Sequence, residues 1–258
     1  MLSMTDYTST DPIGQGIQWL GDAQNWEGVN GIPTRLVEHL GYGALTLLIS
    51  LVIALPIGLY VGHTGRGRVV VVSLAAMFRA LPTLGMITLF ALLSTLGLMP
   101  AIWALVLLAI PPLLTGVYAG ISSVDRAVVD SARSMGMTEW QILFGVEVPN
   151  GLKVMLGGFR GGVLQVLATV AVVAYLPLGG LGRYLIDGVS SNDYGQVFGG
   201  AVLIAVLAIV IDGLLALLTR FSVSPGLRVT ARPTAATVGS EKTVANDTSV
   251  IGVQGGTS

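Results

Sequence analysis

The sequence predicts an all-α integral membrane protein with about five transmembrane helices, or six. Of its 258 residues, 53% are hydrophobic and only 10% are charged. A soluble globule of this length needs more polar surface than this composition supplies. Several uncharged apolar runs are also long enough to cross a hydrocarbon core of about 30 Å at about 1.5 Å per residue. Composition and run length together define the fold class.

Five apolar segments are the candidate membrane spans. The second is interrupted by Arg79 and Pro82, and the third by Pro111 and Pro112. Proline inside a helix removes a hydrogen bond, and such a break within a membrane must line a cavity or find a protein donor. The second segment is long enough to contain an extra half-span, so a total of six spans is the alternative. The expected spans cover about residues 40–62, 69–99, 100–121, 156–178 and 196–218.

The distribution of basic residues predicts the orientation of these spans in the cell (plasma) membrane. With five spans and the N-terminus outside, ten of the 13 Lys and Arg residues lie on cytoplasmic segments, as the positive-inside rule requires. The chain then divides into an extracytoplasmic N-terminal segment (1–38), a transmembrane domain (39–221) and a disordered cytoplasmic tail (222–258). Trp19 and Trp26 indicate a short helix on the membrane surface, with a solvated tail as the alternative.

Residues 122–150 are a polar stretch between long apolar runs, and their pattern predicts two short helices joined at a glycine. Gly136 stands where a helix C-terminus takes a positive φ. Thr138 and Gln141 indicate a capping box for the second helix, which we expect Pro149 to end. An ordinary pair of interfacial helices is the alternative. The apolar stripe expected on the first helix consists of Val124, Val128, Ala132 and Met135.

This stretch resembles the cytoplasmic coupling loop of permease subunits in binding-protein-dependent ABC importers. In that family a Glu-Ala-Ala triplet is followed, after three residues, by Gly and, nine residues later, by Ile-x-Leu-Pro. Three residues here match outright, the carboxylate is one methylene shorter, and the remaining positions carry Ser or Val. The resemblance implies that this loop contacts an ATP-binding subunit. The corresponding residues are Asp130, Ser131, Ala132, Gly136, Val146, Val148 and Pro149.

Other stretches are similar to the subfamily that imports glycine betaine, choline, carnitine or proline. The resemblance covers roughly residues 36–221 and implies a MetI-like permease fold. It also implies three partners, which are an ATP-binding subunit, an extracytoplasmic substrate-binding protein and a second permease subunit, identical or homologous. The stretches that carry it are residues 79–84, 109–114 and 179–182, and the last apolar run with Asp212.

No catalytic site is evident in the sequence, so we expect a transporter subunit and not an enzyme. The glycine-rich stretch 62–68 lacks the order of glycines, lysine and hydroxyl that cradles phosphate and coordinates Mg²⁺. We therefore expect no cofactor in this chain, with ATP and Mg²⁺ bound by the partner ATPase. Two histidines, His39 and His63, and no cysteine argue against a metal site. A net charge of −1 without a basic run gives no argument for nucleic acid.

Arg79 and Asp212 are ionisable residues expected well inside apolar runs, where a lone charge is costly and faces the interior or a partner. The five-span topology places them at similar depths, so we expect them to pair, or to share a polar network, near a translocation path. The alternative is that each is satisfied separately. Pro82 and Pro111 join this candidate path as helix breaks, and Tyr175 as an aromatic face for a quaternary ammonium.

Three other functions stay open from the sequence. The first is the same kind of importer with another amino acid as cargo. The second is an ion-coupled secondary transporter, in which Arg79 and Asp212 would form the coupling site. The third is a membrane scaffold that transports nothing.

Overall fold

The structure is a computed structural model that describes residues 11–94 and 97–222, and every regular element within these residues is a helix. Four helical runs are long and apolar enough to cross a membrane, which confirms the predicted fold class. They are α2 (Ile32–Thr64), α5 (Leu98–Ser122), the run Glu139–Val173 that ends in α8 (Val148–Val173), and α10 (Tyr194–Ser222). The shorter elements are α1 (Pro12–Gly21), η1 (Ala23–Trp26), α3 (Arg68–Ala80), α4 (Thr83–Leu93), α6 (Arg126–Ser134), α7 (Glu139–Ile142), η2 (Leu143–Glu147) and α9 (Gly182–Ser191).

The second predicted span is broken into two short helices. α3 and α4 are each too short to cross a membrane, but together they are long and apolar enough to do so. The pair is bent by 89° at Leu81 and Pro82. Leu81 has an extended backbone (φ −72°, ψ 135°), because the ring of a following proline disfavours the helical conformation. The interruption expected at Pro82 is therefore confirmed, and the protein has four spans, or five if the bent pair counts as one.

The expected interruption of the third span is wrong, because α5 continues through Pro111 and Pro112. The hydroxyl of Thr115 donates to the carbonyl oxygens of both prolines, at 2.9 and 3.1 Å, and supports the following turn. Pro111 itself is buried against neighbouring helices. A proline in a membrane helix is tolerated where side chains and adjacent helices compensate for the lost backbone hydrogen bond.

Two helix boundaries differ from those expected. α2 begins at Ile32, with Pro33 in its first turn, whereas the sequence predicted a span from about residue 40. α8 runs from Val148 to Val173, whereas the sequence predicted a span over residues 156–178. The tail predicted for residues 222–258 lies, from residue 223 onward, outside the described residues.

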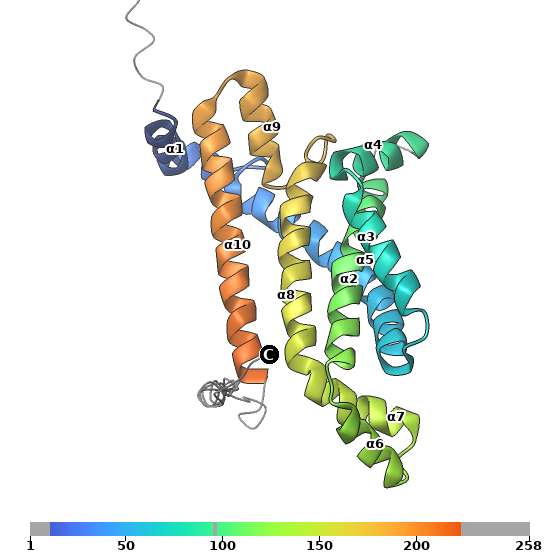
Figure 1. The fold of residues 1–258 in the computed structure, drawn as a ribbon. Coiled ribbons are helices and arrows are strands. Elements are labelled where there is room, and N and C mark those ends of the chain that lie inside the picture. The colour runs from blue at the N-terminus through green and yellow to red at the C-terminus, as the bar shows by residue number, and fades with distance from the viewer. Residues whose placement is uncertain (1–10, 95–96, 223–258) are drawn as a thin grey trace, which may run out of the picture. The chain divides into compact units, whose positions relative to one another are not determined.

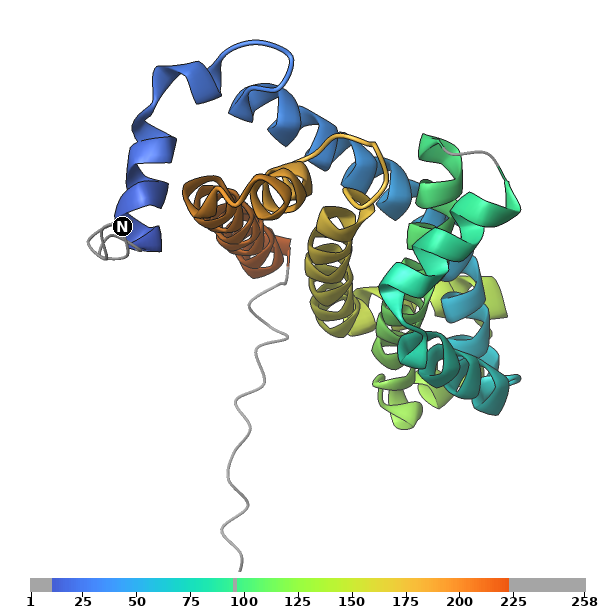
Figure 2. The same ribbon diagram turned by 90° about the horizontal axis from the view of Figure 1, so that it is seen from above.

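The core lies where α2, α5 and α8 pack against one another (Figure 2), and glycines set the distance between them. On α2, Gly58 faces Val117 of α5, and Gly62 faces Ile121 one helical turn further on. Where α5 meets α8, a Cβ added to Gly116 would lie 2.7 Å from the Cα atom of Gly158. Small residues at such positions allow helix backbones to approach closely, as in many membrane bundles.

The N-terminal segment forms a helix that packs on α10. α1 lies beside the start of α10 (Figures 1 and 2), where Gly16 contacts Phe198 and Trp19 contacts Gly199. The indole ring of Trp19 also meets Tyr184 of α9 edge to face, with ring centroids 4.9 Å apart. The helix predicted around Trp19 is thus present, and its tryptophan packs on the protein.

The paired glycines on α8 provide a test of this packing. We expect Gly158→Ala to destabilise the protein, because the added methyl would lie 2.3 Å from the Cα atom of Gly116. Overpacking of this kind costs about 1–3 kcal/mol. Gly157→Ala is the matched control, since nothing lies within 4 Å of its added methyl and both changes raise helix propensity. Thermal unfolding in detergent would measure both, and equal midpoints would contradict the close approach of α5 and α8.

Candidate functional site

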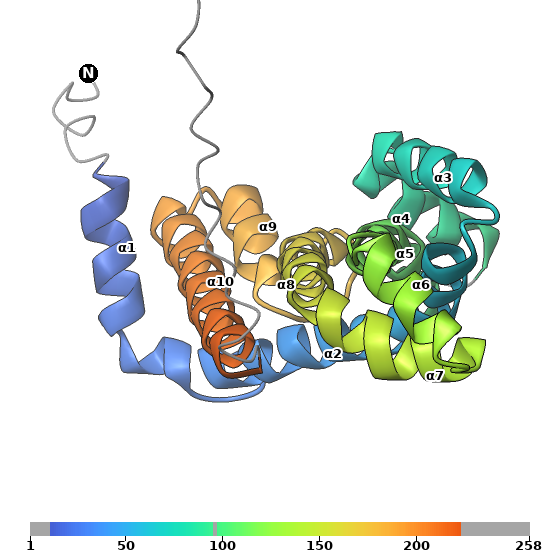
Figure 3. The same ribbon diagram turned by 60° about the horizontal axis from the view of Figure 1, so that its bottom comes forward.

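The polar stretch predicted as two helices folds as α6 and α7 at one end of α5 and α8 (Figures 1 and 3). The side chain of Asp125 caps α6 by accepting from the backbone N–H of Ala127 at 2.9 Å. Gly136 ends it with φ +85°, and the N–H of Met137 reaches back to the carbonyl of Ala132 at 3.3 Å. This is a Schellman-type helix end, which requires a residue that tolerates a left-handed backbone. The predicted turn at Gly136 is confirmed.

α7 begins with the predicted capping box. Thr138 accepts from the backbone N–H of Gln141 through its hydroxyl, and the Gln141 side chain accepts from the N–H of Thr138 at 2.8 Å. Pro149 does not end this helix, contrary to the prediction. A π-helical turn, η2, continues α7 directly into α8, and the N–H of Val148 bonds to the carbonyl of Leu143. The proline falls in the first turn of α8, where its missing N–H is tolerated.

α6, α7 and η2 enclose a small hydrophobic core of their own. Val129, Ala132 and Ile142 are buried, with Val124, Met137 and Val146 packed around them. The predicted stripe was wrong at two positions, because Val128 and Met135 are 46% and 77% exposed. Val124 precedes the cap at Asp125 and therefore does not set the helical register, so Val129 and not Val128 faces inward with Ala132.

The outer surface of this helix pair carries both apolar and charged side chains. Trp140 is 73% exposed and stacks on the ring of Phe144, with centroids 5.9 Å apart. The exposed residues of the predicted coupling motif are Asp130, Ser131, Gly136 and Pro149, while Ala132 is buried and Val146 and Val148 are half-buried. The motif therefore combines core positions with surface positions that are free to meet another chain.

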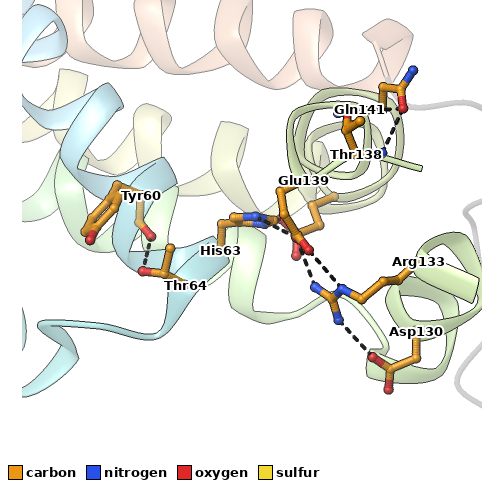
Figure 4. Close-up of polar contacts among 9 residues, drawn as sticks. Tyr60, His63, Thr64, Asp130, Arg133, Thr138, Glu139 and Gln141 are labelled. Carbon is orange, nitrogen blue, oxygen red and sulfur yellow. Dashed lines mark hydrogen bonds and ion pairs between the residues drawn. The ribbon is translucent and has the colours of Figure 1, made fainter. Parts of the chain in front are cut away.

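Arg133 joins the two helices electrostatically (Figure 4). Its guanidinium donates to both carboxylate oxygens of Glu139 at 2.9 and 3.0 Å, and to Asp130 at 3.2 Å. The hydrogen bonds and the negative charge of Glu139 raise the pKa of Arg133. Arg133 thus stays charged, and the pair holds α7 against α6 with the two-point geometry that arginine and carboxylate favour.

A cavity of about 280 Å³ lies at the bend between α3 and α4. Arg79 lines it, exposed and with no hydrogen-bond or ion-pair partner among residues 11–94 and 97–222. Pro111 and Pro112 line it from α5, as does Leu108, whose carbonyl lacks its helical donor because residue 112 is proline. The other lining residues are Phe78, Leu81, Thr83, Gly161 and Gln165. The structure thus brings Arg79, Pro111 and the bend beside Pro82 together.

Asp212 does not pair with Arg79, which corrects the expected contact. It binds Arg160 of α8 through two hydrogen bonds, from Nε to Oδ1 and from Nη2 to Oδ2, both 2.5 Å long. Because α8 begins at Val148, Arg160 lies well inside this helix. An opposite charge on the adjacent helix then satisfies Asp212. Tyr175 is 62% exposed in the loop after α8 and does not line the cavity at the bend.

This arrangement of membrane helices, a broken helix beside a cavity and a folded helix pair at one end defines a membrane permease. A model of the family described as "binding-protein-dependent transport system inner membrane component" matches residues 54–222, and the chain belongs to this family. Its fold resembles an inward-facing structure of the MetNI methionine ABC transporter, with TM-score 0.65 and 21% identity, covering 74% of this chain and 95% of the other.

Curated relatives share about three in ten of their aligned residues with this chain. The osmoprotectant import permease protein OsmW of Salmonella typhimurium is 31% identical over 183 residues, which cover 69% of this chain and 85% of the relative. The glycine betaine/carnitine/choline transport system permease protein OpuCB of Bacillus subtilis is 29% identical over 191 residues, covering 74% and 88%. The predicted resemblance to osmoprotectant importers is therefore confirmed. The ion-coupled alternative loses its proposed charge pair, and the family match does not favour it.

The two possible partners of Asp212 can be separated by double-mutant cycles. We expect Arg160→Ala and Asp212→Ala to be strongly non-additive in their effect on thermal stability in detergent, because each change leaves the other charge unpaired. Arg79→Ala combined with Asp212→Ala is the control cycle and should be additive. Additivity in the first cycle, or coupling in the second, would contradict the observed pairing.

Proposed function

We propose that this chain receives a small compatible solute from an extracytoplasmic binding protein and passes it across the membrane, driven by a separate ATP-binding subunit. The observation that carries this proposal is the α6–α7 pair. It is a self-contained unit with its own buried core, it continues without interruption into α8, and it presents exposed Met135 and Trp140. A rigid unit joined to a membrane helix is suited to transmit the movement of a bound partner.

Within this scheme, Asp130, Ser131, Gly136 and Pro149 face the ATP-binding subunit, and Ala132, Val146 and Val148 support the loop from within. ATP and Mg²⁺ are bound by that subunit. The helix pair lies in the cytoplasm, which places the N-terminus outside and the C-terminus inside. This orientation agrees with the excess of Lys and Arg on the segments assigned to the cytoplasm. The segment before α2 is then extracytoplasmic and the stretch after α10 is a cytoplasmic tail.

The cargo we propose is glycine betaine, choline, carnitine or proline. The names of the relatives support this class, since they include carnitine, choline and glycine betaine permeases. The cavity at the α3–α4 bend is the proposed part of the path, with Arg79 available for a carboxylate and the region of Pro82 and Pro111 free to adjust. Because Tyr175 and Asp212 lie away from this cavity, they are weaker candidates for solute contact.

A second permease subunit, identical or homologous, completes the proposed path. No residue in the apolar window of α10 is buried, although it is the most hydrophobic of the four candidate spans. This exposed apolar surface is suited to contact with another membrane helix.

Affinity purification tests the proposed coupling loop. The tagged chain, extracted in mild detergent from its native membrane, should bring an ATPase subunit with it. We expect Gly136→Val to reduce this recovery, because a β-branched residue at φ +85° is strained by about 1–3 kcal/mol and displaces α7 from α6. Gly145→Ala is the control, since its added methyl would make only an ordinary contact at 3.7 Å with Met137. Undiminished recovery with Gly136→Val would contradict the proposed docking surface.

Solute uptake tests the energy source and the cargo class. Proteoliposomes with the assembled complex and its binding protein should accumulate radiolabelled glycine betaine or a related solute only when ATP is supplied to the ATPase side. Uptake that persists without ATP and stops with an uncoupler would instead indicate ion coupling. A complete absence of flux for each of the four solutes would contradict the proposed cargo.

A further inference from the structure

The charged contacts of the α6–α7 pair extend beyond it to the end of α2. His63 lies in the last turn of α2, and its ring contacts two carboxylates of the following segment. Its Nε2 atom is 3.2 Å from Glu139, and its Nδ1 atom is 2.5 Å from Glu147. Figure 4 shows His63 facing Glu139, which in turn faces Arg133. A continuous set of polar contacts therefore runs from Arg133 of α6 through Glu139 of α7 to His63 of α2.

Glu147 is the residue that makes this contact costly to lose. It lies in the π-helical turn η2 and is only 2% exposed. A buried carboxylate is normally paired, and removing its partner leaves an uncompensated charge. Each ring nitrogen of His63 lies within hydrogen-bond distance of a carboxylate oxygen, so His63 contacts Glu147 on one side and Glu139 on the other.

A cavity separates α2 from α7 beside this contact. It is apolar, has a volume of about 390 Å³, and is lined from α2 by Pro56, Leu59 and Tyr60 and from the other side by Trp140 and Phe144. Among the described residues, His63 is the only side chain of α2 with a hydrogen bond or ion pair to residues 126–147. The polar contact therefore bridges a gap that apolar packing does not fill.

We propose that His63 is a positioning residue that clamps the end of α2 to the coupling helices, so that movement of α6 and α7 carries α2 with it. The inference rests on the proposed function and assigns a role to a helix that does not belong to the coupling loop. α2 packs along α5 through Gly58 and Gly62, directly before the clamp. A shift of α6 and α7 thus reaches α5 and α8 through the chain, and α2 through His63. The clamp makes the three core helices respond as one unit.

The test compares wild type, His63→Gln and Tyr60→Phe in the complete complex with its ATPase and binding protein. We expect His63→Gln to keep ATP hydrolysis but to lower solute transported per ATP on the order of tenfold, the usual scale of coupling between sites. Tyr60→Phe is the matched control, because it lies one turn earlier on α2 and its hydroxyl has no polar partner among the described residues. Glu139→Gln weakens the contacts of Glu139 with both His63 and Arg133 and leaves the buried pair of His63 and Glu147 intact, so it tests the whole set of polar contacts and should shift the ratio in the same direction.

A distance measurement separates clamping from a general loss of structure. The chain has no cysteine, so spin labels at Thr64→Cys and Gly145→Cys report only on α2 and on η2, and neither replaces a residue of the proposed docking surface. Their separation should stay constant between the nucleotide-free and ATP-bound complexes in wild type, and should change or broaden in His63→Gln.

Two results would overturn the clamp alone. The first is a wild-type complex that couples transport to ATP while His63→Gln transports equally well. The second is a label distance that changes as much in wild type as in the variant. A wild-type complex that does not use ATP for uptake would overturn the proposed function, and the clamp with it.

Discussion

The close approach of α5 to α8 is the constraint on which the rest of this structure depends. Gly116 and Gly158 face each other across this contact, and Gly120 and Gly151 repeat it nearer the α6–α7 pair. Apolar side chains give little preference for helix association over lipid, so backbone packing at small residues supplies much of the attraction. The same seam fixes the end of α5 next to the start of α8. The chain between them therefore folds back on itself and forms the compact helix pair α6 and α7.

The proline residues have different effects according to their surroundings. At Leu81 and Pro82 the chain bends by 89°, and Arg79 and residues of α5 and α8 line the neighbouring cavity. In α5 two consecutive prolines leave the helix continuous, with Thr115 bonding to their carbonyls. A π-helical turn joins α7 to α8, and Pro149 lies in the first turn of α8. The outcome differs with position: Pro82 follows the end of α3, Pro111 and Pro112 lie within a continuous helix, and Pro149 lies in a first turn, where its missing N–H is tolerated.

Local signals in the sequence predicted local structure well. The capping box of Thr138 and Gln141 and the turn at Gly136 depend on residues within a few positions of each other. Long apolar runs likewise predicted the membrane helices. The contacts of Asp212 with Arg160 and of His63 with Glu147 join residues 52 and 84 positions apart. They depend on the point at which α8 begins and on the register between helices, which no local pattern reports. One signal for Arg160 was present in the sequence: it is a basic residue inside the apolar run expected at residues 156–178, where a charge needs a partner.

The helix α1 has a steric consequence for anything that approaches α10 within the membrane. Its residues Gln15, Gly16 and Trp19 pack on Gly195, Phe198 and Gly199, so the first turns of α10 are already covered by the chain itself. Beyond Gly199, the large side chains Ile209, Leu214 and Leu218 are exposed by half or more. The family match starts at residue 54 and therefore does not include α1. On the side that α1 covers, a lateral neighbour therefore meets α10 only beyond Gly199.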